Sequence, residues 1–210
     1  MLNKRDELQL LIDTNEPEII GITEVIPKGL KKIVKTEFEI NGYELFINEN
    51  CKRGAALYIK KERNPLKYVN LCEKPFEESV WAHFECPNGN KVLIGCIYKS
   101  PSSSDVNNTE LINLLHSAEF EKFDHVCIVG DFNFPDIDWV YFSQIGEGER
   151  KFIDAIQDAF MYQMVKKPTR NKEGQKASVL DLVIVNNGCL VSDIEHCSPI
   201  GKSNHDVLSF

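Results

Sequence analysis

Short apolar runs alternate with segments of helical periodicity along this chain. Residues 126–129 form an unbroken apolar run with β-branched side chains, which predicts a strand buried on both faces of a sheet. Residues 107–118 carry apolar side chains at helical spacing, with Asn107 as the expected N-cap and Glu110 completing a capping box. A strand at 92–98, this helix and the strand at 126–129 form a crossover, so the sheet should contain parallel neighbours.

The same patterns predict the remaining elements. Alternating or continuous apolar residues predict strands, and apolar residues three and four positions apart predict helices. The further strands are expected at residues 18–24, 43–47, 54–60, 79–86, 161–165 and 178–185 and after His205, and the further helices at 5–13 and 148–160. A chain of 210 residues is long enough for one sizeable core, so we expect a single domain over residues 1–210.

Carboxylates follow two of the buried strands. Asp131 comes directly after the strand at 126–129 and Gly130, and Glu24 ends the strand at 18–24. Oxygen ligands from separate strand ends suit a hard cation such as Mg²⁺. If strand geometry continues to Asn133, its carboxamide points the same way as the Asp131 carboxylate, and the pair could orient a water molecule. The alternatives are a polar turn at Asp131 and Asn133 and an ordinary exposed acid at Glu24.

Asp181 lies within the apolar strand predicted at residues 178–185, where a charge is costly unless it is paired. His205 is a natural partner, because a buried carboxylate that accepts from one imidazole nitrogen fixes the tautomer and raises the basicity of the ring. On the residue alone, a structural histidine at the start of a strand is the favoured interpretation.

The formal net charge of −8 argues against a protein that coats nucleic acid by bulk electrostatics. It leaves open a nuclease whose acids hold a cation while local basic pairs contact phosphates. No apolar run approaches the roughly 20 residues of a membrane span, and the chain starts without the apolar core of a signal peptide, so we expect an intracellular protein that does not enter a membrane. The candidate basic pairs are Lys31-Lys32, Lys52-Arg53, Lys166-Lys167 and Arg170-Asn171-Lys172.

Seven cysteines are present and no two of them form a Cys-x-x-Cys pair, which gives no support for a zinc ribbon or a thioredoxin-type site. His83 with Cys86 and His196 with Cys197 could be zinc half-sites, but neither has a second half at suitable spacing. Reduced thiols, most of them buried, are the expected state.

Five motifs in this order resemble the endonuclease/exonuclease/phosphatase superfamily. They are Ile22-Thr23-Glu24, Ile97-Tyr98, Gly130-Asp131-Phe132-Asn133, Leu180-Asp181 and Ser203-Asn204-His205. The phrases GDFNFPDIDW from residue 130, YKSPSS from residue 98 and Pro168-Thr169-Arg170 are similar to the apurinic-type endonuclease domain of non-LTR retrotransposons. The resemblance covers essentially the whole chain and implies an α/β fold of two facing mixed β-sheets flanked by helices, a four-layer sandwich.

The resemblance also implies roles for seven residues. Glu24 and Asn204 would bind the metal ion, Mg²⁺ or Mn²⁺. Asp131 would activate the attacking water with help from Asn133, and Tyr98 would contact the scissile phosphate. His205, held by Asp181, would stabilise the charge that develops on the phosphoryl oxygens. The implied activity is nicking of one DNA strand to prime retrotransposition, by a protein of the nucleus whose reverse transcriptase domain lies in the same polyprotein.

Two departures from the superfamily pattern affect these expectations. Members open with a core strand that bears an asparagine, whereas this sequence opens at the helix that follows, so the resemblance predicts a domain without its first core strand. Asn204 stands where the motif has an aspartate, which should weaken cation binding, and Asp206 is expected to point elsewhere. Both departures suit a rival interpretation, a weakened or inactive remnant that binds DNA or a protein partner. A phosphatase of the same superfamily is the third interpretation.

Overall fold

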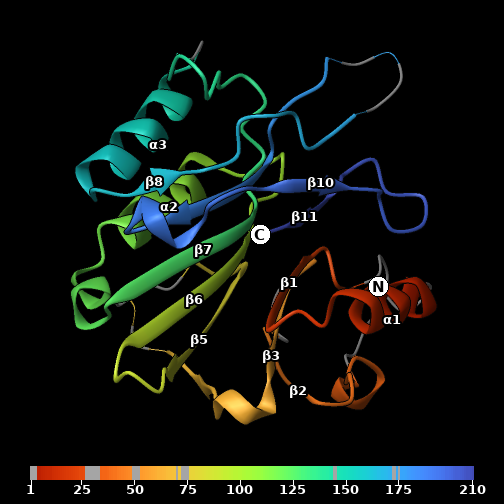
Figure 1. Ribbon diagram of the computed structural model, residues 1–210. Coiled ribbons are helices and arrows are strands. Elements are labelled where there is room, and N and C mark those ends of the chain that lie inside the picture. Colours follow the sequence, from red (N-terminus) through yellow and green to blue (C-terminus); the bar gives the residue numbers. More distant parts are fainter. Residues whose placement is uncertain are drawn as a thin grey trace.

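The computed structural model describes residues 4–26, 34–48, 53–69, 71, 76–143, 146–171, 174 and 176–210, which form stacked helical and sheet layers (Figure 1). The helices are α1 (Arg5–Asn15), α2 (Asp105–Leu115) and α3 (Glu147–Asp158). The strands are β1 (Ile19–Thr23), β2 (Tyr43–Ile47), β3 (Ala55–Lys60), β4 (Leu66–Lys67), β5 (Ser79–Glu85), β6 (Lys91–Tyr98), β7 (His125–Asp131), β8 (Tyr162–Gln163), β9 (Asp181–Val185), β10 (Glu195–Cys197) and β11 (Val207–Ser209). Short 3₁₀ turns lie at Lys35–Glu37, Lys61–Arg63, Ala118–Lys122 and Gly188–Leu190.

The largest sheet has six strands in the order β4-β5-β6-β7-β9-β8. β6 and β7 run parallel, as the crossover predicted, and the other pairs are antiparallel. In this register Tyr98 on β6 lies beside Asp131 on β7, and Asp131 lies beside Asp181 on β9. Three polar side chains therefore lie side by side where the neighbouring strands β6, β7 and β9 meet one end of the sheet. We call this end, marked by Tyr98, Asp131 and Asp181, the site edge of the sheet.

A second, antiparallel sheet of order β1-β3-β2 faces the first, and a two-stranded sheet joins β10 to β11. Leu57 and Ile59 of β3 pack in one buried cluster with Ala82 of β5 and Ile94 of β6. α2 and α3 cover the outer face of the six-stranded sheet, and α1 covers the outer face of the three-stranded sheet (Figure 1). The expected arrangement of two facing sheets flanked by helices is confirmed.

Each outer layer forms because one stripe of its helix is apolar. Leu111 and Leu114 of α2 and Phe152 and Ile156 of α3 are almost completely buried against the six-stranded sheet. On α1, Leu8 and Ile12, four positions apart, do the same for the other sheet. None of the described helices is long and apolar enough to cross a membrane.

The predicted N-cap of the crossover helix, Asn107, was wrong by three residues. α2 begins at Asp105 because the Ser104 side chain is the N-cap: its Oγ accepts from the backbone N–H of Asn107 at 3.3 Å. Asn107 lies inside the first turn, and its amide donates to Ser103 Oγ at 2.9 Å. A serine in this polar loop satisfies the free N–H groups of the first turn as well as asparagine would.

Two of the predicted strands are shorter than expected. β8 covers only two residues of 161–165, and β9 begins at Asp181, so that carboxylate opens the strand instead of interrupting it. Ser178 forms an isolated bridge to Arg170, which in turn bridges His205. These bridges bring three distant segments together at the sheet edge. The pairing of β10 with β11 was not predicted.

Among the described residues, β1 is hydrogen-bonded to one strand, β3, and β11 to one strand, β10. The expectation of a further core strand stays a prediction. The described cysteines are all free, and they lie outside any disulfide. Lys31, Lys32, Lys52 and Lys172, which belong to the candidate basic pairs, lie outside the described residues.

Replacing Gly130 on β7 with alanine should strongly destabilise the folded protein. Gly130 has φ of +140°, and a Cβ there would lie 1.9 Å from the carbonyl oxygen of Ile97 on the neighbouring strand. We expect Gly130→Ala to lower the free energy of unfolding by about 3 kcal/mol, measured by urea denaturation. Gly148→Ala is the matched control: it lies in α3 with no atom within 4 Å of the added carbon and should be neutral or stabilising by up to about 1 kcal/mol. Equal effects of the two changes would contradict the account.

Candidate active site

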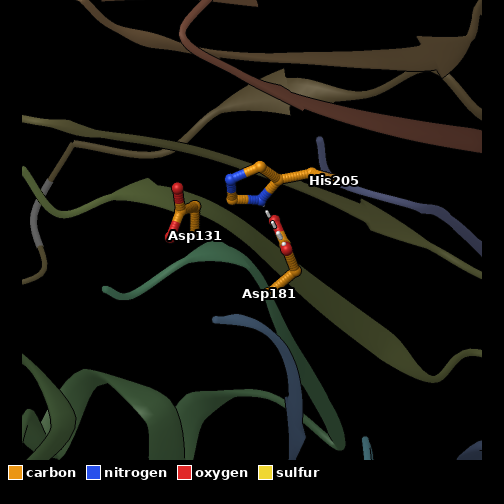
Figure 2. Close-up of side chains that lie close together, drawn as sticks. All are labelled: Asp131, Asp181 and His205. Atoms are coloured by element: carbon orange, nitrogen blue, oxygen red, sulfur yellow. Dashed lines mark hydrogen bonds and ion pairs between the residues drawn. The ribbon is translucent and has the colours of Figure 1, made fainter. Parts of the chain in front are cut away.

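Asp181 and His205 form a hydrogen-bonded pair at the edge of the six-stranded sheet (Figure 2). His205 Nδ1 lies 2.8 Å from Asp181 Oδ2, and the backbone N–H of His205 donates to Ser203 Oγ at 3.1 Å. With Asp181 at Nδ1, the other ring nitrogen, Nε2, lies on the side of the ring that faces Asp131 (Figure 2). The structure thus joins the two residues that the sequence analysis proposed as partners.

Thr169 orients this pair, and the sequence analysis gave it no role. Its hydroxyl donates to Asp181 Oδ2 at 2.7 Å and accepts from the backbone N–H groups of Leu180 and Asp181. Thr169 is fully buried, so these bonds are shielded from water. The available signal was the phrase Pro168-Thr169-Arg170, which supported the resemblance without pointing to a contact.

Asp131 lies next to the pair and is only 5% exposed. One ligand atom each from Asp131, Asp181 and His205 lies within 4.8 Å of the other two (Figure 2). Burial and the charge of Asp181 raise the pKa of Asp131 to about 7, and the charge of His205 partly opposes the rise. A carboxylate with a pKa near neutrality can take up a proton during a reaction at physiological pH.

The pKa of His205 is raised above its ordinary value. Burial alone would lower it, but the hydrogen bond to Asp181 and the charges of Asp181 and Asp131 outweigh burial. The imidazole is therefore protonated and positively charged more often than an ordinary histidine at the same pH. A partly buried cation at this site suits stabilisation of negative charge on a substrate.

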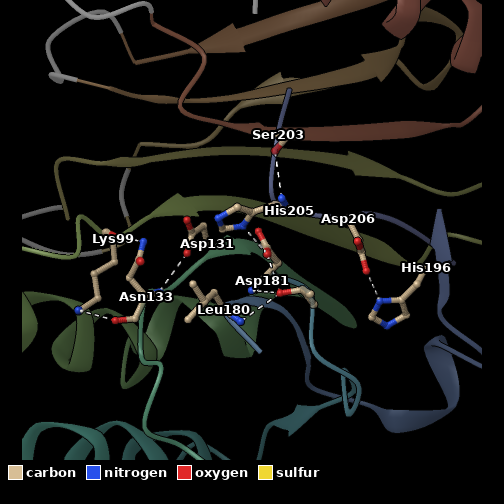
Figure 3. Close-up of polar contacts among 10 residues, drawn as sticks. Lys99, Asp131, Asn133, Leu180, Asp181, His196, Ser203, His205 and Asp206 are labelled. Carbon is tan, nitrogen blue, oxygen red and sulfur yellow. Dashed lines mark hydrogen bonds and ion pairs between the residues drawn. The ribbon is translucent and has the colours of Figure 1, made fainter. Parts of the chain in front are cut away.

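Asn133 corrects one geometric expectation. β7 ends at Asp131, and Asn133 has a left-handed backbone with φ of 47°, so strand geometry does not continue. Instead, the N–H of Asn133 donates to Asp131 Oδ1 at 3.1 Å and its side-chain amide donates to the carbonyl of Lys99 at 2.8 Å (Figure 3). A tight turn rather than a strand thus holds Asn133 beside Asp131, and the polar-turn interpretation is compatible with the site.

Lys99 secures that turn from the neighbouring strand end. Its ammonium donates to the backbone carbonyl of Asn133 at 3.3 Å and lies 4.1 Å from the centre of the Phe134 ring. Burial lowers the pKa of Lys99. Lys99 was not among the residues picked out from the sequence, because a lysine after a strand is usually solvated.

Glu24 and Tyr98 meet on the other side of Asp131. The Tyr98 hydroxyl donates to Glu24 Oε1 at 2.7 Å, and Arg53 forms an ion pair with Glu24 Oε2. Burial, the bond to Glu24 and the charges of Glu24 and Asp131 raise the pKa of Tyr98, so the phenol stays a neutral donor. The charge of Glu24 also raises the pKa of Asp131, which places the two carboxylates in one electrostatic neighbourhood.

Asn204 lies at the rim of the site. This asparagine is exposed, and its backbone carbonyl accepts from the N–H of Asn171 at 3.0 Å. Its role as a metal ligand stays a prediction. Asp206 faces away from the site, as expected, and lies 3.0 Å from His196 Nδ1 (Figure 3).

The residues at this edge fit a hard divalent cation. Glu24, Asp131 and Asp181 bring carboxylates to this site, and carboxylate oxygens are donors that Mg²⁺ and Mn²⁺ prefer. Asp131, Asp181 and His205 bring one ligand atom each within 4.8 Å of one another. His205 is bonded to Asp181 through Nδ1, an arrangement that suits either a metal ligand or a group that acts on a substrate through Nε2.

A family model described as endonuclease-reverse transcriptase matches residues 92–209, more than half of the sequence. The chain belongs to this family. The matched residues include Tyr98, Asp131, Asp181 and His205, and Glu24 lies before them. A comparison of the sequence with curated proteins found no match.

Solved structures share the fold. The endonuclease domain of TRAS1, a telomere-specific non-LTR retrotransposon, is 13% identical with a TM-score of 0.72, over 97% of this chain and 89% of that domain. The 3′ phosphatase NExo from Neisseria, bound to a product DNA hairpin, is 13% identical with a TM-score of 0.68, over 98% of this chain and 92% of the NExo chain. The Xenopus laevis APE2 catalytic domain is 13% identical with a TM-score of 0.61, over 98% of this chain and 86% of the APE2 chain. At these identities the likeness establishes the fold, that of the endonuclease/exonuclease/phosphatase superfamily, as the resemblance predicted.

Proposed function

We propose that this protein is a divalent-metal-dependent DNA endonuclease that nicks one strand and leaves a 3′-hydroxyl from which a reverse transcriptase can start. The observation that carries the proposal is the meeting of Tyr98, Asp131 and Asp181 on three adjacent strand ends, with His205 bonded to Asp181. The family to which the chain belongs is described as endonuclease-reverse transcriptase, which supports the same activity.

The site residues divide the work of phosphodiester hydrolysis. Asp131, whose pKa lies near 7, takes the proton of the attacking water, and Asn133 orients that water. His205, charged and held by Asp181, stabilises the negative charge that develops on the phosphoryl oxygens. Tyr98, a neutral phenol, donates a hydrogen bond to a non-bridging oxygen of the phosphate.

Glu24 and Asn204 would hold Mg²⁺ or Mn²⁺ at this site. A bound cation of this kind neutralises charge on the phosphate and on the leaving oxygen. Glu24 is about half exposed at its side chain, so its carboxylate lies within reach of solvent although Tyr98 and Arg53 contact its oxygens. Asn204 contributes an oxygen without the charge of an aspartate, which reduces the attraction for the ion.

The proposed partners are DNA and a reverse transcriptase domain of the same polyprotein, with the nucleus as the place of action. The description of the family names both activities, and the TRAS1 domain that shares the fold is an endonuclease of a retrotransposon. The neutral Asn204 favours a second candidate function, a weakened or inactive remnant that binds DNA or a protein partner. The two candidates differ in whether a phosphodiester bond is cut.

Incubation of supercoiled plasmid with the purified protein and Mg²⁺ tests the proposal. Conversion to open circles should require the metal, stop with EDTA and disappear in Asp131→Asn. Asp136→Asn is the matched control, since Asp136 is an exposed acid five residues further on and its loss should leave nicking unchanged. Binding of DNA without nicking would select the remnant, and release of phosphate from a 3′-phosphorylated oligonucleotide without nicking would select a phosphatase.

Asn204→Asp should strengthen cation binding. The change puts a carboxylate at the exposed residue before His205, and a further negative charge at the proposed metal site attracts a divalent ion. We expect the Mg²⁺ concentration for half-maximal nicking to fall by about 10-fold, which corresponds to about 1.4 kcal/mol of added binding free energy. The measurement is a Mg²⁺ titration of the plasmid assay. An unchanged midpoint would remove Asn204 from the metal site.

A further inference from the structure

Arg53 is paired with Glu24, whose carboxylate is proposed to bind the metal. Its guanidinium pairs with Glu24 Oε2, while the Tyr98 hydroxyl holds Oε1 at 2.7 Å. The Arg53 side chain is only 22% exposed, so it lies within the site instead of extending into solvent. A metal ion can therefore reach Glu24 only by displacing or sharing a protein partner.

The backbone directs Arg53 to this position. The N–H of Ile26 donates to the carbonyl of Arg53 at 2.9 Å, and the N–H of Val25 donates to that of Gly54, so the pairing of β1 with β3 continues past the strand ends. Gly54 has φ of +69° and Glu24 has φ of +51°, two left-handed residues that turn the paired segments at the mouth of the site. Arg53 and Glu24 thus face each other across a fixed turn.

A guanidinium and a divalent cation repel each other, so they cannot both neutralise one carboxylate at full strength. A DNA phosphate is an alternative partner for arginine, because its planar group matches phosphate oxygens with two parallel hydrogen bonds. We propose that Arg53 is a phosphate-binding residue that Glu24 holds in the site until a divalent cation takes the carboxylate. This inference rests on the proposed function and names the residue through which metal and DNA binding are coupled.

The coupling has a definite sign. Cation binding frees Arg53 for the phosphate, and phosphate binding frees Glu24 for the cation, so each ligand strengthens the other. Arg53→Met removes the competitor at Glu24 and the partner of the phosphate together. The variant should bind the metal more tightly in the absence of DNA and bind DNA more weakly in the presence of metal.

Two binding measurements test this on the full chain. Mn²⁺ titration followed by electron paramagnetic resonance, without DNA, should show at least 3-fold tighter binding by Arg53→Met than by the wild type. Fluorescence anisotropy with a labelled duplex in Ca²⁺ should show at least 5-fold weaker binding, with the salt dependence reduced by about one phosphate contact. Arg53→Lys keeps the charge and most of the packing, and should keep the wild-type Mn²⁺ affinity while losing part of the duplex affinity.

Arg63→Met is the matched control. Arg63 pairs with Glu18 at 2.8 Å, another arginine–glutamate pair at the opposite ends of β1 and β3, and its loss changes the net charge equally. Both affinities should stay at the wild-type value. Unchanged or weaker Mn²⁺ binding by a folded Arg53→Met, or an unchanged duplex affinity, would overturn the inference. A wild type that binds both ligands as described but does not nick would overturn the proposed function alone, and one that binds neither would overturn both.

Discussion

Asp131→Asn should abolish nicking and at the same time stabilise the metal-free protein at pH 8. Nicking should fall by at least 10³-fold, because the group that accepts the proton of the attacking water is removed. The gain in stability follows from burial: the pKa of Asp131 is raised from an ordinary 3.8 to about 7, so its charged form is disfavoured in the folded state. Asparagine keeps the oxygen that accepts from the N–H of Asn133 and carries no charge.

The pH dependence gives the stability effect a sign. Between pH 3.8 and about 7 the folded protein binds more protons at Asp131 than the unfolded chain does. The free energy of unfolding of the wild type therefore falls as pH rises through this window, by on the order of 2–4 kcal/mol at about 1.4 kcal/mol per pKa unit. Asp131→Asn lacks this loss, so urea denaturation should show the variant to be more stable at pH 8 and equal to the wild type near pH 4.

Asp181→Asn is the contrasting variant for stability. Asp181 accepts hydrogen bonds from Thr169 and His205, so the loss of its charge removes favourable contacts and should destabilise the protein at pH 8.

Saturating Mg²⁺ should narrow the difference in free energy of unfolding between the wild type and Asp131→Asn, because a nearby cation stabilises the charged carboxylate that the wild type alone carries. Destabilisation of Asp131→Asn at pH 8 would show that Asp131 is not a costly buried charge.

Asp181→Asn should have the second largest effect on activity. The carboxylate fixes the tautomer of His205 and raises its pKa, so the change leaves an imidazole that is less often charged and less well oriented. We expect kcat for a short duplex to fall by about 10²- to 10⁴-fold, the range of a lost acid–base group. The alkaline limb of the pH–rate profile should move to lower pH, since His205 loses its proton earlier.

His196→Gln is the control for that variant. His196 and Asp206 form a second histidine–aspartate pair at 3.0 Å on β10 and the approach to β11, outside the site. Breaking this pair should leave kcat within about 3-fold of the wild type and leave the pH profile unmoved. If both variants lost activity equally without a shift of the alkaline limb, the role of Asp181 would be structural.

The strand ends were predictable from the sequence because buried strands have a strong local signature. Residues 126–129 and 18–24 identified β7 and β1, and with them the positions of Asp131 and Glu24. The partnership of Asp181 and His205 could be proposed because an acid in an apolar strand needs a partner. The resemblance to the superfamily then supplied the two facing sheets, which periodicity alone does not give.

What the sequence missed depends on tertiary contacts. Thr169 and Lys99 act through bonds to residues in other segments of the chain, and each is an ordinary loop or strand-end residue by local pattern. Arg53 was a candidate for contacting phosphate as part of a basic pair, but its ion pair with Glu24 has no local signal. A turn at Asn133 was one of two alternatives from the sequence, and the contact with Lys99 that accompanies the turn is not visible in the local pattern. The start of α2 was misplaced because Ser104 and Asn107 are both good N-caps, and packing selects between them.

The central claim is that Glu24, Asp131, Asp181 and His205, far apart in the sequence, surround one site that holds a divalent cation. Crystals soaked in Mn²⁺ and measured at its absorption edge test this directly, since anomalous scattering locates the ion independently of any assigned role. The account predicts one strong peak within coordination distance of a Glu24 carboxylate oxygen, on the side that faces Asp131. A peak elsewhere on the protein, with none beside Glu24 at saturating Mn²⁺, would contradict it.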